Sequence, residues 1–149
     1  MLSAFLEEKV EFMIVGAVAM AFHGYVRATG DIDFWIRVST ENADKVWRAL
    51  KRFGAPYFDL NKRDLLTAGM VFQIGIPPNR IDIINEIDGV EFDASWPNHK
   101  IAVFGELEIP TIGKADLLIN KRTSDRPKDR NDVLWIEKYP EVENDQFRA

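Results

Sequence analysis

The sequence predicts an α+β fold in which helices pack against a mixed β-sheet, and three observations indicate it. Short apolar runs rich in β-favouring residues alternate with segments whose apolar residues recur at helical spacing. Two pairs of such runs flank turn-forming residues, as in antiparallel hairpins. A chain of 149 residues with 46% hydrophobic residues can bury one core, so we expect a single domain over residues 1–149.

The first part of the chain is expected to alternate helices and strands. Residues 1–9 carry apolar side chains at helical spacing, and residues 12–15 form a short apolar run that suits a buried strand. Small and apolar residues over 17–24 then predict a buried helix. Alternating residues predict a strand over 31–38, and a hydroxyl side chain after it can cap a helix over 39–52.

The second part of the chain is expected to form two hairpins and two closing helices. Residues 70–76 and 80–87 flank a Pro-Pro-Asn turn and predict an antiparallel pair. A smaller hairpin is expected where residues 100–104 and 107–109 flank a glycine.

Apolar spacing predicts the closing helices over 112–121 and 131–138. The polar tail from about residue 140 is expected to fray.

Composition limits the classes of function. The chain has no cysteine, which excludes disulfides and thiolate metal sites and fits a cytoplasmic location. Its apolar run over 12–22 is too short to span a bilayer, so we expect no membrane anchor. The net charge of −5 means that any polyanion must be bound locally.

The sequence Gly-Asp-Ile-Asp-Phe-Trp-Ile at 30–36 is the most informative motif. Side chains alternate in a strand, so Asp31 and Asp33 project to the same face. Like charges held close together repel, and a divalent cation such as Mg²⁺ between them relieves the repulsion. The pair therefore predicts a metal site.

A third carboxylate stands on a later strand. Asp82 lies between Ile81 and Ile83, and a buried unpaired charge is costly. If its strand adjoins that of Asp31 and Asp33, the three carboxylates can hold two Mg²⁺ ions that serve an in-line displacement at phosphorus. The alternative is a charge at a strand end that reaches water.

The turn at Gly16 offers the complementary half of such a site. Where a strand stops and a helix begins, free backbone NH groups point outward and can bind phosphate. Arg27 and Thr29 lie between this turn and the aspartates, and the Arg27 guanidinium suits a phosphate oxygen. The alternative for Gly16 is turn geometry alone.

Basic residues also gather near the C-terminal end and exceed the acidic residues among them. They are Lys114, Lys121, Arg122, Arg126, Lys128 and Arg130. A solvated helix face with paired charges and a contact to phosphate or acceptor are both open interpretations.

The string VGAVAMAFHGYVRATGDIDFWI, followed by the aspartate in RIDII, resembles the nucleotidyltransferase superfamily with the DNA polymerase β-like catalytic core. The segment KADLLINKRTSDRPKDRNDV is similar to the bacterial branch that includes toxins of abortive-infection and toxin–antitoxin systems. Together the motifs cover residues 12–133. The DxD alone is unspecific, whereas the ordered set of motifs is much more specific.

The resemblance implies transfer of a nucleoside monophosphate from a nucleoside triphosphate to an acceptor hydroxyl, with release of pyrophosphate. It implies that Asp31 and Asp33 bind Mg²⁺. It also implies that Asp82 binds the catalytic metal and helps to remove the proton of the acceptor hydroxyl.

It also places Gly16 under the triphosphate, with the backbone NH of Ala17 beside it. The family usually has glycine or serine at this second position. Lys121 and Asp129 match the lysine and aspartate of the toxin branch. Lys121 suits a phosphate contact, and Asp129 has as its alternative a structural pairing with Lys128, Arg126 or Lys121.

Two other functions remain open. The chain can be a non-catalytic nucleotide-binding or protein-interaction module on the same fold, or a two-metal nuclease. The acceptor is RNA, a protein or a small molecule in the nucleotidyltransferase interpretation, and an antitoxin is a candidate partner.

Overall fold

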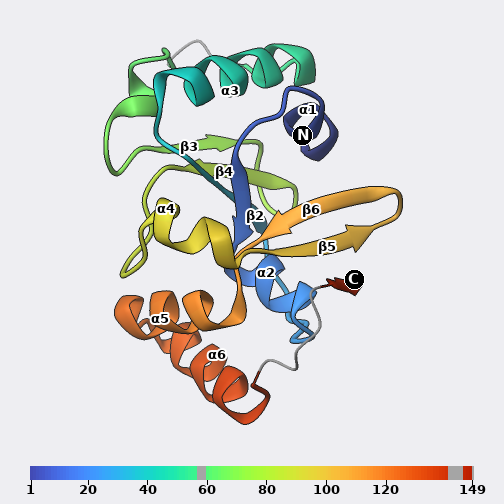
Figure 1. The fold of residues 1–149 in the computed structure, drawn as a ribbon, viewed down its shortest axis with the longest axis vertical. Coiled ribbons are helices and arrows are strands. Elements are labelled where there is room, and N and C mark those ends of the chain that lie inside the picture. Colours follow the sequence, from blue (N-terminus) through green and yellow to red (C-terminus); the bar gives the residue numbers. More distant parts are fainter. Residues whose placement is uncertain (57–59, 141–145, 149) are drawn as a thin grey trace.

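A computed structural model describes residues 1–56, 60–140 and 146–148, and its strands lie between two groups of helices (Figure 1). The elements in chain order are α1 (Leu2–Glu7), β1 (Phe12–Val15), α2 (Gly16–Phe22), β2 (Asp31–Ile36), α3 (Thr40–Phe53), η1 (Asp64–Leu66), β3 (Val71–Ile74), β4 (Arg80–Ile84), α4 (Phe92–Ser95), η2 (Trp96–Asn98), β5 (Lys100–Phe104), β6 (Leu107–Thr111), α5 (Lys114–Ser124), α6 (Pro127–Lys138) and β7 (Gln146–Arg148).

The strands form one mixed sheet in the order β3-β4-β2-β1-β6-β5-β7. Neighbouring pairs β1–β2, β3–β4 and β5–β6 are antiparallel, whereas β1–β6, β2–β4 and β5–β7 are parallel. Helices α1 and α3 lie at one end of the view, and α5 and α6 lie at the other (Figure 1). The predicted α+β architecture with a mixed sheet is confirmed.

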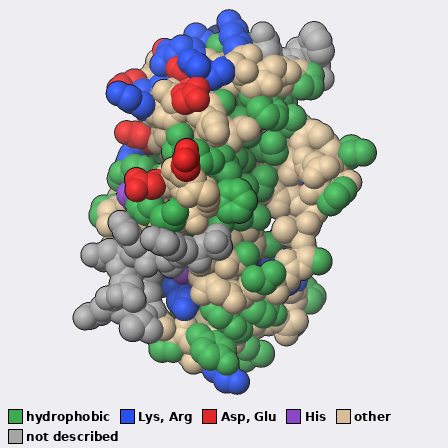
Figure 2. All heavy atoms as spheres, turned by 90° about the vertical axis from the view of Figure 1, so that its right-hand side faces the viewer, with side chains coloured by type: hydrophobic (Ala, Val, Ile, Leu, Met, Phe, Trp, Pro, Cys, Tyr) green, Lys and Arg blue, Asp and Glu red, His purple; other side chains and the backbone are tan. Residues whose placement is uncertain are grey.

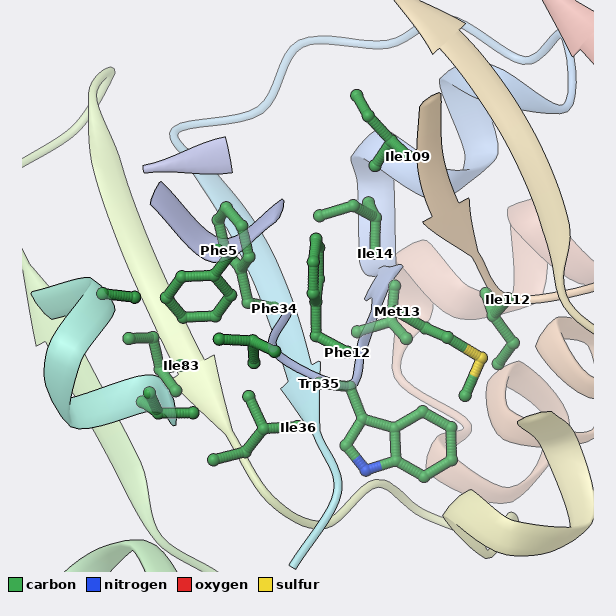
Figure 3. Packing of buried hydrophobic residues seen from close by; sticks show 14 of the residues in the cluster. Phe5, Phe12, Met13, Ile14, Phe34, Trp35, Ile36, Ile83, Ile109 and Ile112 are labelled. Carbon is green, nitrogen blue, oxygen red and sulfur yellow. The ribbon is translucent and has the colours of Figure 1, made fainter. Parts of the chain in front are cut away.

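The core is densest where α1 meets the centre of the sheet. The rings of Phe5, Phe12 and Phe34 contact one another with centroids 5.0 to 5.5 Å apart (Figure 3). Trp35, the next residue of β2, projects to the opposite face of the sheet and is 1% exposed. The apolar run of β1 is buried along its whole length, so the centre of the sheet is covered on both faces.

Both predicted hairpins are confirmed, but the first is shorter than expected. β3 and β4 end at Ile74 and Ile84 instead of residues 76 and 87. The Asn85 side chain ends the pairing, because it accepts a hydrogen bond from the Met70 NH and donates to the Leu65 and Thr67 carbonyls. β2 likewise ends at Ile36, before the turn in which Ser39 caps α3.

The closing helices are confirmed with shifted starts. α5 begins at Lys114, because the NH of Ile112 bonds to the Ile14 carbonyl and extends the sheet. α6 begins at Pro127, four residues earlier than predicted. Proline suits the first helical turn, and the Asp129 side chain accepts a hydrogen bond from the Arg126 NH.

Three short elements were not expected from the sequence, namely η1, α4 with η2, and β7. Burial of Phe92 against Trp35, with ring centroids 5.1 Å apart, places α4 on the sheet. Within the tail that was expected to fray, residues 146–148 pair in parallel with β5. Residues 141–145 and 149, also part of that prediction, lie outside the described residues.

Charged side chains of both signs gather on the end of the molecule formed by α1 and α3 (Figure 2). Arg48 and Arg52 of α3 pair there with Glu7 and Glu8. In the part of the chain that the structure describes, no helix has the length and apolar character needed to cross a membrane.

Candidate metal and nucleotide site

Register places the three aspartates on one face of the sheet. β2 and β4 run in parallel, with Asp33 directly opposite Asp82 and Asp31 opposite Arg80. Residues two apart in a strand share a face, so all three aspartates project together. One carboxylate oxygen from each lies within 4.8 Å of the others. The structure thus brings the three residues together, and their role as metal ligands stays a prediction.

Asp33 differs from the other two carboxylates in that it accepts no hydrogen bond from the residues that the structure describes. Burial, followed by the charges of Asp31 and Asp82, raises the pKa of Asp33 to about 7. Within the described ranges, no residue donates a hydrogen bond to this side chain. A carboxylate in this position gains from a nearby cation.

Arg80 binds the other two carboxylates and was not predicted as a site residue. Its Nη2 lies 2.6 Å from Oδ2 of Asp31 and 3.2 Å from Oδ2 of Asp82, while its Nε lies 2.9 Å from Oδ1 of Asp82. These hydrogen bonds raise the pKa of Arg80. The sequence did carry a signal, because Arg80 precedes Asp82 by two positions and therefore shares its face.

The turn after β1 adjoins the same carboxylates. Gly16 begins α2 with φ of +69°, a conformation that favours glycine. A Cβ at this position would collide with Oδ2 of Asp33. Glycine is therefore required here both by the backbone and by the neighbouring aspartate, and its role under a phosphate stays a prediction.

A cavity of about 450 Å³ joins the turn, the aspartates and the last two helices. Gly16 and Ala17 line it on one side, next to the three aspartates, and Arg126 and Lys128 line it from the start of α6. A volume of this size is in the range of small-molecule sites. Arg27, Thr29 and Lys121 also line it, so every predicted nucleotide-binding residue borders the cavity.

Lys121 is 2% exposed and lies between two buried carboxylates. Its Nζ is 3.0 Å from Oδ2 of Asp132 and 3.3 Å from Oδ1 of Asp129. Asp129 pairs with Lys121 and Arg126, two of the partners that the structural alternative named, and its role in the site stays a prediction. In this structure Lys121 fixes α5 to α6, and its contact with phosphate stays a prediction.

Arg27 and Arg126 are held at the cavity wall by the same two aspartates. Arg27 donates two hydrogen bonds to Asp132, at 3.2 and 3.0 Å, and Arg126 donates two to Asp129, at 2.7 and 3.2 Å. Burial opposes ionisation of Asp129, but the hydrogen bonds from Arg126 and the charge of Lys121 hold its pKa below the ordinary value. Asp132 was not predicted, although it is part of the C-terminal motif.

The residues present fit a divalent cation that prefers oxygen ligands. Three carboxylates supply the hard donors that suit Mg²⁺, and Asp33 offers two oxygens without a hydrogen-bond donor among the described residues. The carboxylates also lie directly beside the turn and cavity that would receive a phosphate chain.

Comparison with known proteins supports the same architecture. The chain is similar to the crystal structure of a “putative nucleotidyltransferase” from Thermotoga maritima, with a TM-score of 0.54 and 15% sequence identity. The alignment covers 93% of this chain and 86% of that one. The fold is nucleotidyltransferase-like. No family model matches the sequence, and no curated protein shows significant similarity to it.

Proposed function

We propose that the protein is a Mg²⁺-dependent nucleotidyltransferase that moves a nucleoside monophosphate from a nucleoside triphosphate to an acceptor hydroxyl. The observation that carries the proposal is the meeting of Asp31, Asp33 and Asp82 within 4.8 Å, beside a glycine turn and a cavity, on a nucleotidyltransferase-like fold. A glycine turn or a carboxylate cluster alone is common. Their combination at one cavity suits a metal-bound triphosphate, because the turn can bind the phosphates and the carboxylates can bind the metal.

The residues divide the work of this reaction between them. The acceptor oxygen bonds to the α-phosphorus as the bond from that phosphorus to the bridging oxygen breaks, and pyrophosphate leaves. Two Mg²⁺ ions held by the three aspartates would stabilise the attacking and leaving oxygens. Asp82 lies on β4, the strand farther from the Gly16 turn, and is suited to accept the hydroxyl proton.

The phosphates would lie on the side of the aspartates that faces the Gly16 turn, away from the acceptor hydroxyl at Asp82. The backbone NH groups of Gly16 and Ala17 begin α2 and can donate to phosphate oxygens. Arg126 and Lys128 add positive charge at the same cavity, and Arg126 is oriented by Asp129. Asp132 likewise holds Arg27 at the wall.

The direct test is incubation with each α-labelled nucleoside triphosphate, Mg²⁺ and cell extract as the source of acceptor. We expect label on an acceptor together with released pyrophosphate, and a loss of at least about a hundredfold in Asp33→Asn and Asp82→Asn. Asp44→Asn is the control, because this exposed carboxylate pairs with Lys62 far from the triad. Absence of both products with every nucleotide would contradict the proposal.

The same reaction mixtures distinguish the other two functions. A binding module would retain the nucleotide without transfer, and its affinity would be unchanged in Asp31→Asn and Asp33→Asn. A two-metal nuclease would degrade RNA or DNA without any nucleoside triphosphate.

The proposal includes the bacterial toxin branch, acting in the cytoplasm on RNA, a protein or a small molecule and held in check by an antitoxin. Its support is the C-terminal motif, whose Lys121 lines the cavity and pairs with Asp129 and Asp132 of the same motif. Growth arrest on expression of the wild type but not of Asp33→Asn would support this part. Equal growth of both strains would contradict it.

A further inference from the structure

The hydrogen bonds within the carboxylate cluster are unevenly distributed. Both oxygens of Asp82 accept from Arg80, one oxygen of Asp31 accepts from Arg80, and the other accepts from the Thr29 hydroxyl at 3.0 Å. The two oxygens of Asp33 accept none from the described residues. The guanidinium therefore holds the position between Asp31 and Asp82 that a bridging cation would need.

Competition between Arg80 and a metal follows from this geometry. An oxygen that binds a divalent ion in the plane of its lone pairs can no longer accept the same hydrogen bond from arginine. Moreover, the guanidinium and the ion carry charge of the same sign, so they repel when both lie among the three aspartates. A cation bound by all three carboxylates thus competes with Arg80 for the oxygens of Asp31 and Asp82.

We propose that Arg80 is an internal cation that competes with divalent metal for Asp31 and Asp82, and thereby sets the metal affinity of the site. This inference rests on the metal site of the proposed function. Without metal, the single positive charge of Arg80 offsets part of the negative charge of Asp31 and Asp82, and its hydrogen bonds hold both carboxylates in place. When metal enters, its guanidinium moves into the cavity that it already lines.

The surroundings of Arg80 allow such a movement. The side chain of Arg80 is 29% exposed. Arg80 is the first residue of β4 and follows the turn at residues 75–79. The only described carboxylates that it contacts are Asp31 and Asp82, so displacement breaks no other ion pair within residues 1–56, 60–140 and 146–148. Arginine does not lose its charge in proteins, so this competition persists at every working pH.

The experiment is a titration of the metal-free protein with Mn²⁺, followed by electron paramagnetic resonance of the unbound ion, without nucleotide. We expect Arg80→Gln to bind Mn²⁺ at least about tenfold more tightly than the wild type, and Arg80→Lys to lie between them. The control is Arg48→Gln, which removes an arginine paired with Glu8 on α3 and should leave Mn²⁺ affinity unchanged. Equal or weaker binding by Arg80→Gln overturns the inference.

A second measurement uses the wild type and does not depend on the folding of a variant. The Nε–H of Arg80 donates to Asp82, so its NMR signal should be protected from exchange without metal and lose that protection as Mg²⁺ is added. Protection that persists at saturating Mg²⁺ overturns the inference.

The outcomes also separate this inference from the proposed function. Tighter binding by Arg80→Gln without any nucleotidyl transfer supports the role of Arg80 and contradicts the enzymatic proposal. Absence of Mn²⁺ binding in both proteins overturns the metal site, and the inference with it.

Discussion

Gly16 lies so close to Asp33 that a Cβ on the glycine would collide with Oδ2 of the aspartate. Gly16 begins α2 directly after β1, whose last residue, Val15, pairs with Asp33 of the antiparallel strand β2. The glycine turn and the pair of Asp31 and Asp33 are therefore one structural unit. A phosphate bound by the turn and a cation bound by Asp33 would be adjacent.

Gly16→Ala should lower the free energy of unfolding by more than the backbone conformation alone requires. A positive φ costs a non-glycine residue about 1 kcal/mol, and displacement of Asp33 adds to this cost. The matched control is Gly105→Ala, which has φ of +62° and nothing within 4 Å of its Cβ. Urea unfolding should show the larger loss for Gly16→Ala, and equal losses would contradict the predicted contact.

Asp33 gives the metal-free protein a distinctive dependence on pH. Its pKa of about 7 in the folded state lies above the ordinary value of 3.8, so the folded state binds more protons between these values. The stability that Asp33 contributes is therefore fully present below pH 4 and is lost as the pH rises through 7. Burial of the Asp33 carboxylate, followed by repulsion from Asp31 and Asp82, is the physical cause.

Urea unfolding with a chelator measures this effect. The free energy of unfolding of Asp33→Asn relative to the wild type should increase between pH 5 and pH 8, by about 2.6 kcal/mol at roughly 1.4 kcal/mol per pKa unit. Added Mg²⁺ should remove the advantage of the variant at pH 8, because it stabilises the ionised wild type. A difference that does not change with pH would contradict the raised pKa.

Asp132 should be essential for the attachment of α6 to the rest of the site. It is fully buried and pairs with both Arg27 and Lys121. Asp132→Asn removes the charged partner of Arg27 and one of the two charged partners of Lys121, and should cost about 3 kcal/mol or more in unfolding free energy. The control is Asp125→Asn, whose exposed pair with Arg130 should contribute less than about 1 kcal/mol. Similar losses in both variants would contradict the structural role of Asp132.

The sequence was sufficient for features that depend on local pattern. Alternation along the strand placed Asp31 and Asp33 on one face, and burial cost indicated that Asp82 needed partners. The meeting of all three required β2 and β4 to be neighbours. That condition could be stated from the sequence, and the register of Asp33 opposite Asp82 meets it.

The partners of the charged residues could not be derived in the same way. Arg27 meets Asp132 across 105 positions of the chain, and such a pair depends on how α6 packs against the loop before β2. The pairing of β7 could not be derived from the sequence either, because this short strand pairs only where the edge of β5 is open to it. Local pattern identifies a charge, but the tertiary fold selects its partner.

The central claim is that three aspartates bind divalent cations together, beside a turn that receives the triphosphate. A crystal structure with Mn²⁺ and a nonhydrolysable nucleoside triphosphate tests it most directly, with anomalous scattering to locate the ions. The account predicts ions ligated by Asp31, Asp33 and Asp82, with the phosphates at Gly16 and Ala17. Ions bound away from Asp82, or a triphosphate bound away from the Gly16 turn, would contradict it.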